Sequence, residues 1–332
     1  LQLGTTTLGG AAVLTAGGAV TQDGDIRVTG TTAITAAGQT VFLDRADNDF
    51  TGSVAVTAQD LTLRDVNALQ LGTTTLGGAA VLIAGGAVTQ DGDIRVTGTT
   101  AITATGQTVR LDRADNDFTG SVAVTAQDLT LRDVNALQLG TTTLGGAAVL
   151  IAGGAVTQDG DIRVAGTTAI TAAGQTVFLD RAANDFSGSV AVTAQDLTLR
   201  DVNALQLGAT TLGGAAVLIA GGAVTQDGDI RVAGTTAITA TGQTVRLDRA
   251  DNDFTGSVAV TAQDLTLRDV NALRLGATTV GGAAVLTAGG AVTQDGDIRV
   301  SGTTAITAAG QTVRLDRADN DFTGSVTVTA ED

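Results

Sequence analysis

The sequence predicts an all-β protein that coils as a parallel β-solenoid, also called a parallel β-helix, and three observations lead to this fold class. The composition is rich in glycine and in residues that favour strands, the chain consists of near-identical 68-residue repeats, and each repeat contains a shorter degenerate pattern. Short strands joined by sharp corners account for all three observations, and helices account for none of them.

The composition is the first observation. Hydrophobic residues make up 43% of the 332 residues, yet only seven residues are aromatic, all of them Phe, and the chain has 45 Gly and no Pro. The apolar bulk therefore comes from Ala, Val, Leu and Ile, with much Thr beside them. This mixture favours pleated backbone with frequent corners and opposes helix formation.

The long repeat is the second observation. LQLGTTTLGG at residue 1 recurs at residues 69 and 137, and close variants begin at residues 205 and 273. The first two copies differ only at Thr15/Ile83, Ala37/Thr105 and Phe42/Arg110. We therefore predict a single solenoid over residues 1–332, built of the repeats 1–68, 69–136, 137–204, 205–272 and the truncated 273–332.

A shorter pattern inside each repeat is the third observation. VTGTTAITA, FTGSVAVTA and LGGAAVLIA align on an apolar first residue, Gly third, an aliphatic seventh residue and Ala ninth. Their starts at Val28, Phe50, Leu76 and Val96 are 22, 26 and 20 residues apart, about the length of one solenoid rung. Each repeat is thus predicted to form three rungs, and the chain about 14–15. Runs such as TTAITA, QTVFL and NDFTG predict three strands per rung.

Position 42 identifies the outer surface. It is Phe42 and Phe178 in two copies but Arg110, Arg246 and Arg314 in the other three. A guanidinium in a packed apolar core is costly, whereas an exposed Phe is ordinary, so this position is predicted to point outward. Strand alternation then predicts the following inward positions: Val41 and Leu43 and, by the same argument from the Thr15/Ile83 exchange, Leu14 and Leu82.

A second set of phenylalanines never changes between copies. It consists of Phe50, Phe118, Phe186, Phe254 and Phe322. Because apolar Val28 and Leu76 begin the neighbouring patterns, we expect these phenylalanines to anchor the core or its corners. The alternative is an exposed aromatic row. Alanines at the ends of the patterns (Ala36, Ala58 and Ala84) are expected to fill narrow parts of the interior.

The acidic run DRADND offers three carboxylates within six residues, and calcium binds such oxygen ligands. The candidate ligands are Asp44, Asp47 and Asp49. The run lacks the spacing of a calcium loop, and Ala183 replaces Asp47 in the third copy. We therefore favour no metal and no cofactor, and expect Asp and Asn to cap a corner through hydrogen bonds to the backbone. Calcium is kept as the minority alternative.

The charged and reactive residues restrict the function. A net charge of −16 opposes binding to nucleic acid. His, Lys, Cys and Tyr are absent, so the usual nucleophile and base pairs cannot form, and we expect no enzymatic activity.

Outward Thr residues raise ice binding as an alternative, but Ala and Val interrupt the regular Thr array that it needs. Neither a signal peptide nor an apolar stretch of membrane-spanning length is visible in the sequence.

The repeats resemble those of filamentous haemagglutinin-like adhesins, bacterial exoproteins exported by two-partner secretion. The matching elements are LQLGTTTLGG, VLTAGGAVTQDGDIRVTGTTAITA, LDRADNDFTGSVAVTA and LTLRDVNALQLG, which cover the whole chain. The resemblance implies a right-handed parallel β-helix at the bacterial cell surface or outside the cell, with an outer-membrane secretion partner. The secretion domain of that family has no counterpart here.

These observations predict a structural shaft of an extracellular fibre or adhesin, serving in adhesion or biofilm cohesion. The alternative is a binding module that engages cell-surface glycans, calcium or neighbouring shafts through many weak contacts. The predicted partners are other copies of the chain, end to end or laterally; host or neighbouring cell-surface glycans are the partners that the binding-module alternative implies. Because a solenoid end exposes a strand edge, fragments are expected to polymerise end to end.

Overall fold

The computed structural model describes residues 1–331, which divide into two compact units, Leu1–Gly166 and Thr167–Asp332. Both units are all-β, and no helix occurs in the described residues. No segment of that range therefore forms a helix long and apolar enough to cross a membrane. The predicted all-β class is confirmed.

The strands of the unit Leu1–Gly166 are β1 (Gln2–Leu3), β2 (Thr6–Leu8), β3 (Ala12–Thr15), β4 (Thr21–Gln22), β5 (Ile26–Val28), β6 (Thr32–Leu43), β7 (Asp49–Phe50), β8 (Val54–Asp65), β9 (Leu69–Leu76), β10 (Ala80–Ala84), β11 (Val88–Gln90), β12 (Ile94–Val96), β13 (Thr100–Leu111), β14 (Asp117–Phe118), β15 (Val122–Asp133), β16 (Leu137–Leu144), β17 (Ala148–Ala152), β18 (Val156–Gln158) and β19 (Ile162–Val164).

The strands of the unit Thr167–Asp332 are β20 (Thr168–Leu179), β21 (Asp185–Phe186), β22 (Val190–Asp201), β23 (Leu205–Leu212), β24 (Ala216–Ala220), β25 (Val224–Gln226), β26 (Ile230–Val232), β27 (Thr236–Leu247), β28 (Asp253–Phe254), β29 (Val258–Asp269), β30 (Leu273–Leu275), β31 (Thr278–Val280), β32 (Ala284–Ala288), β33 (Val292–Gln294), β34 (Ile298–Val300), β35 (Thr304–Thr307), β36 (Asp321–Phe322) and β37 (Val326–Thr329).

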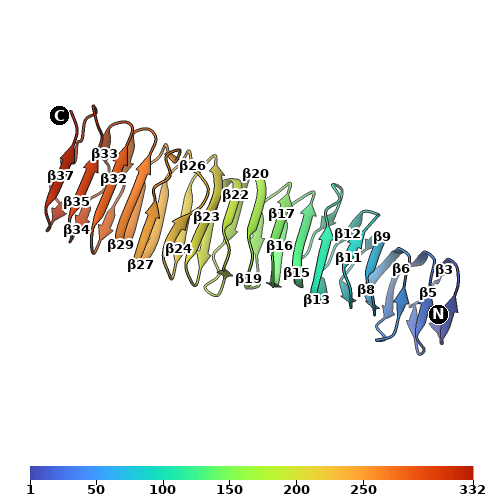
Figure 1. The fold of residues 1–332 in the computed structure, drawn as a ribbon. Helices are drawn as coiled ribbons and strands as arrows, with labels where there is room; N and C mark the ends of the chain where they lie inside the picture. Colours follow the sequence, from blue (N-terminus) through green and yellow to red (C-terminus); the bar gives the residue numbers. More distant parts are fainter. Residues whose placement is uncertain (332) are drawn as a thin grey trace. The chain divides into compact units, whose positions relative to one another are not determined.

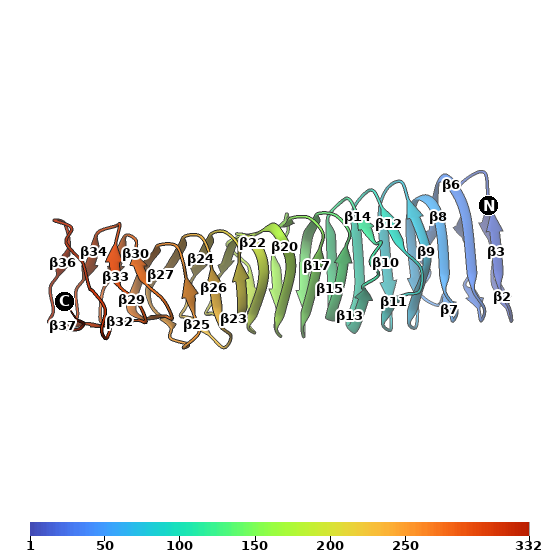
Figure 2. The same ribbon diagram turned by 90° about the horizontal axis from the view of Figure 1, so that it is seen from above.

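Parallel pairing between successive turns builds each unit (Figures 1 and 2). One ladder of the first unit runs through β6, β8, β10, β13 and β15 and joins Val41, Leu61, Ala80, Thr100 and Val122 in register. Each step of this ladder advances the chain by about 20 residues, the length of one solenoid turn. Parallel strands separated by one turn of chain define a β-solenoid, so the predicted architecture is confirmed.

The prediction that each 68-residue repeat forms three rungs does not agree with the strand register of this ladder. Four turns of the ladder carry the chain from Val41 only as far as Val122, so a 68-residue repeat makes about three and a third turns. The equivalent of Val41 in the next copy is Val109, which pairs with Val88 and Leu129 in a different ladder. Counted over both units, the strands stack in about 16 turns, close to the 14–15 predicted.

The error lies in the long interval between Phe50 and Leu76. Val28 does pair with Phe50, as predicted, but Leu76 pairs with Ala58, which lies nearer to it in the chain than Phe50 does. Strand β9 forms part of a turn there, although its sequence LQLGTTTL lacks the pattern shared by the other rungs. Alignment of similar segments therefore missed one partial turn in every repeat.

A twelve-residue strand such as β13 pairs in two different ladders, because it bends in the middle. The pairing of β13 with β15 shifts register between Ala104 and Thr108, and Gly106 in this gap has a φ of +71°. Only glycine adopts this conformation without strain. The equivalent glycines share it: Gly38, Gly174, Gly242 and Gly310, with φ between +68° and +72°.

The core agrees with the alternation predicted from position 42. Val41 and Leu43 are fully buried, whereas Phe42 between them is 43% exposed. Leu82 is buried and Ile83 is half-buried. Leu14 is only half-buried, against expectation, because it lies in the first turn of its unit and is covered from one side.

The unchanging phenylalanines are core residues. Phe50, Phe118, Phe186 and Phe254 are each 1% exposed, and Phe322, in the last described turn, is half-buried. The exposed aromatic row is thus wrong for this set. The pattern alanines Ala36, Ala58 and Ala84 are buried as well.

Candidate functional site

The acidic run is a corner organised by Asn48, whose side chain is fully buried. Its Oδ1 accepts hydrogen bonds from Gln22 Nε2 at 2.8 Å and from the Ile26 backbone N–H at 3.0 Å. Its Nδ2 donates to Gln22 Oε1 at 2.8 Å and to the Leu43 carbonyl at 3.2 Å. Asn48 therefore caps the corner by bonding backbone groups, which confirms the prediction for the Asn of this run.

The candidate calcium ligands do not converge. Asp44 and Asp47 are exposed and Asp49 is half-buried, while Asn48 between them points into the corner. Within residues 1–331, no three acidic side chains come close enough together to hold a metal ion. The corner thus provides no preformed cage of carboxylates for calcium.

Ion pairs connect neighbouring turns beside this corner. Arg45 Nε donates to Asp25 Oδ1 at 2.8 Å, and the hydrogen bond and charge of Asp25 raise the pKa of Arg45. The equivalent pair Arg113–Asp93 measures 2.6 Å. All four groups are partly exposed to solvent, so these pairs set the geometry of the corner more than they stabilise it.

A buried aspartate in the LRDVN segment was not anticipated. Asp65, Asp133, Asp201 and Asp269 are each 1% exposed. Alternation could have revealed them, since Leu61, Leu63 and Asp65 share the inward side of β8. A polar residue at a predicted core position of a strand was the available signal.

The best-defined member of this set is Asp133. Its Oδ1 accepts a hydrogen bond from the Asn135 N–H at 3.0 Å, and its Oδ2 accepts a longer one from the Phe118 N–H at 3.3 Å. Burial raises the pKa of Asp133 to about 6; the two N–H donors oppose this rise and the charge of Asp117 adds to it. In the other three copies, the N–H of the equivalent Phe also lowers the pKa of the aspartate, but its contact with Oδ2 is weaker than the hydrogen bond in the copy with Asp133.

These aspartates predict a stability that falls as pH rises. The pKa of about 6 in the folded chain exceeds the ordinary value of 3.8, so the folded chain binds more protons than the unfolded chain between these pH values. The contribution of the four groups is therefore most favourable below about pH 4 and is lost as pH rises through 6. Melting temperatures from pH 4 to 7.5 will measure this trend.

The matched variant for this prediction is Asp133→Asn, which keeps the shape and removes the charge. At pH 7.5 it is expected to stabilise the chain by about 1–2 kcal/mol, because removal of the buried charge outweighs the unfavourable approach of two donors, the new amide nitrogen and the Phe118 N–H. At pH 4 the gain should vanish. A gain that is equal at both pH values would show that ionisation of Asp133 is not its cause.

The position of Phe42 and Arg110 lies on the outer face, as predicted. Both side chains are exposed, and Arg110 Nε donates to Asp112 Oδ2 at 2.7 Å. The residues that pair with Phe42 in successive turns are uncharged: Thr62, Val81, Ala101 and Ala123. Beside this row lies an open depression of about 370 Å³, lined in part by Arg64, Ile83, Thr103 and Thr105.

Comparison with known families gives one match. A family model described as repeats of unknown function (DUF5649) matches five times in tandem, at residues 1–57, 58–125, 126–193, 194–261 and 262–329. These matches have the 68-residue period found in the sequence but begin at another point of the repeat. No curated protein and no solved structure matches the chain.

Proposed function

Because the chain belongs to the family described as repeats of unknown function (DUF5649), whose description names no activity, we propose its function from its architecture: a non-enzymatic structural shaft of an extracellular bacterial fibre or adhesin. The observation that supports this proposal most is the uninterrupted parallel pairing of turn upon turn within each unit. Such a coil can be lengthened by copying a repeat without changing the contacts inside it.

The finer parts of the proposal rest on the resemblance of the repeats to a known family, except the three strands per rung, which the strand pattern of the repeat predicts. The shaft coils right-handedly with three strands per rung and stands on the cell surface or outside the cell, after passage through an outer-membrane secretion partner. These features are those of the filamentous haemagglutinin-like adhesins that the repeats resemble. Near-identical copies suit a spacer that holds something at a distance from the cell. A specific active site, in contrast, would need one copy to differ from the others.

A binding module is the second candidate function, and the outer face supplies its supporting observation. Phe42 and Phe178 are each 43% exposed although the fold does not need an aromatic residue there. An exposed ring beside Thr hydroxyls can stack on a sugar and hydrogen-bond its hydroxyl groups. Repetition of the position would then give avidity to weak glycan contacts.

Two measurements test the shaft. Antibodies to the repeats should label intact producing cells, and purified chain should bind neither a glycan array nor host cells. Labelling that requires permeabilised cells would contradict the surface location. Binding of the purified chain to glycans, lost in Phe42→Ala/Phe178→Ala, would instead support the binding module.

A further inference from the structure

The outer face of the first unit carries a strip without charge, which we name the Phe42 strip: Phe42, Thr62, Val81, Ala101 and Ala123. These side chains are in register on five successive turns, and all are exposed or half-buried. The chain as a whole has a net charge of −16, but the strip itself carries no charge, and the charged residues beside Thr62 are one of each sign, Asp60 and Arg64.

The equivalent position in the next copy, Arg110, lies on a different surface of the coil. We name this surface the Arg110 strip; it consists of Arg110, Thr130 and Val149, which are in register on successive turns. The Arg110 side chain is 65% exposed and bonds Asp112 through Nε, which leaves the flat face of the guanidinium open. The second unit repeats both surfaces, with Phe178, Thr198, Val217, Ala237 and Ala259 in one strip and Arg246, Thr266, Val285, Ala305 and Thr327 in the other.

Folding does not require the exposed phenylalanine. Val109 and Leu111 are as fully buried beside Arg110 as Val41 and Leu43 are beside Phe42. The choice between Phe and Arg therefore leaves the core unchanged and alters only the outer face. A phenyl ring and a guanidinium attract each other through stacking and cation–π interaction, so the two residues that alternate at this position are complementary to one another.

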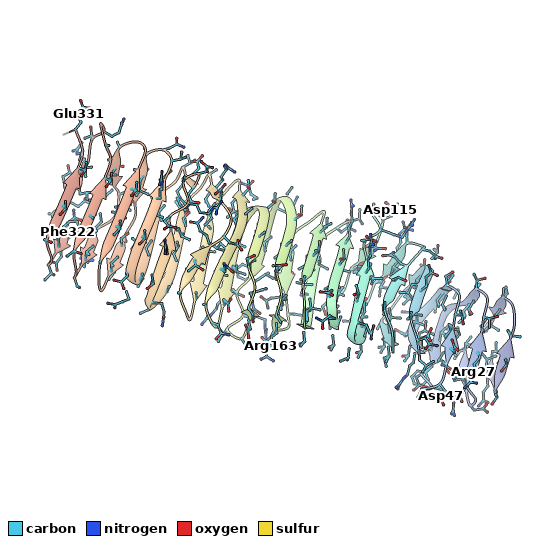
Figure 3. All side chains as sticks on the ribbon, in the orientation of Figure 1. Arg27, Asp47, Asp115, Arg163, Phe322 and Glu331 are labelled. Carbon is cyan, nitrogen blue, oxygen red and sulfur yellow. The ribbon has the colours of Figure 1, made fainter. Side chains whose placement is uncertain are left out.

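The two strips lie on different sides of the coil. Ala101 of the Phe42 strip and Arg110 belong to the same strand, β13, but are separated by the bend at Gly106. The equivalent residues Asp47 and Asp115 also project from opposite edges of this unit (Figure 3). The two strips are separated because one repeat makes about three and a third turns. A residue and its equivalent in the next copy therefore lie about a third of a turn apart around the coil, in different ladders.

We propose that the Phe42 strip of one molecule binds the Arg110 strip of a second copy of this chain, side by side. This inference deepens the proposed shaft by naming its lateral partner and the residues that contact it. Because each copy uses one side to receive Arg and another to present it, the contact is heterologous, and the assembly grows beyond a dimer instead of closing.

Three forms of the full 332-residue chain test the proposal by sedimentation velocity over a range of concentrations: the natural chain, an all-Arg form (Phe42→Arg/Phe178→Arg) and an all-Phe form (Arg110→Phe/Arg246→Phe/Arg314→Phe). Each new residue already occurs at the equivalent position of another copy, so folding should be retained, which melting curves will verify. Both variants should need about tenfold more protein to associate, since one partner of each contact is missing.

Mixing the two variants is the decisive measurement. All-Arg and all-Phe chains should associate with each other as the natural chain does with itself. The charge control is Arg95→Gln/Arg163→Gln/Arg231→Gln, which removes three exposed charges elsewhere and should leave association unchanged.

Three results would overturn the proposal. The natural chain could remain monomeric at every concentration, the all-Phe form could associate more strongly than the natural chain, or both variants could associate unchanged, as contact through the chain ends would predict. Association in solution is independent of where the cell places the protein. Failure of surface labelling would therefore reject the shaft without affecting this result.

Discussion

Replacing Phe118 by alanine is expected to destabilise the first unit by about 3–5 kcal/mol, the cost of a large cavity in a packed core. Phe118 is 1% exposed and pairs in register with Val96 of the preceding turn. The surrounding ladders are held by hydrogen bonds on both sides and can close only part of the space. Urea unfolding followed by circular dichroism, with hydrogen exchange of β12 and β15 as a local probe, will measure the loss.

The matched control uses another aromatic residue of the same chain. Phe42→Ala removes the same atoms from a side chain that is 43% exposed, so it should cost less than about 1 kcal/mol. Equal losses at positions 42 and 118 would show that the buried ring is not a core anchor. Because a solenoid can unfold in segments, the comparison should use the hydrogen-exchange rates of each turn as well as the overall midpoint.

Replacing Asn116 by alanine is expected to cost about 2–4 kcal/mol, since it leaves buried polar groups without partners. Asn116 Oδ1 accepts from Gln90 Nε2 at 2.8 Å and from the Ile94 N–H at 3.0 Å, while its Nδ2 donates to Gln90 Oε1 at 2.7 Å. Alanine satisfies none of these groups. Thermal melting should show the loss, and the Ile94 amide should exchange faster.

The adjacent residue of the same corner provides the control. Asp115→Ala introduces the alanine that the third copy already has as Ala183, and it should leave the melting temperature unchanged. A large loss in this variant would mean that the acidic side chains hold the corner. Calcium would then regain support, and melting with and without a chelator would test it directly.

Much of the candidate site was predictable because exchanges between copies act as internal experiments. The Phe42/Arg110 exchange identified the outer face, and the buried positions on either side followed from the two-residue period of a strand. The acidic corner and the capping role of its Asn were predicted, but the side-chain partner of that Asn was not. Asn48 holds the corner through Gln22, which lies 26 residues earlier, and a contact across turns is invisible in a local motif.

The buried aspartates show a second limit. Asp65 follows Leu61 and Leu63 on the inward side of β8, so its burial was implied by alternation. The N–H group that makes its burial tolerable belongs to Asn67, two residues later in the same corner, and it comes within reach of the carboxylate only once the corner is formed.

The sequence by itself determined the all-β solenoid, the tandem repeat and the division of side chains between core and surface, because these depend on composition, on period and on strand alternation within a few residues. Only the tertiary structure decided how many turns one repeat makes. Turn length is set by corners, by the bend at Gly106 and by register shifts, and β9 forms part of a turn without sharing the pattern of the other rungs. That length makes equivalent residues face different directions, so the surface available to partners was not contained in the repeat sequence alone.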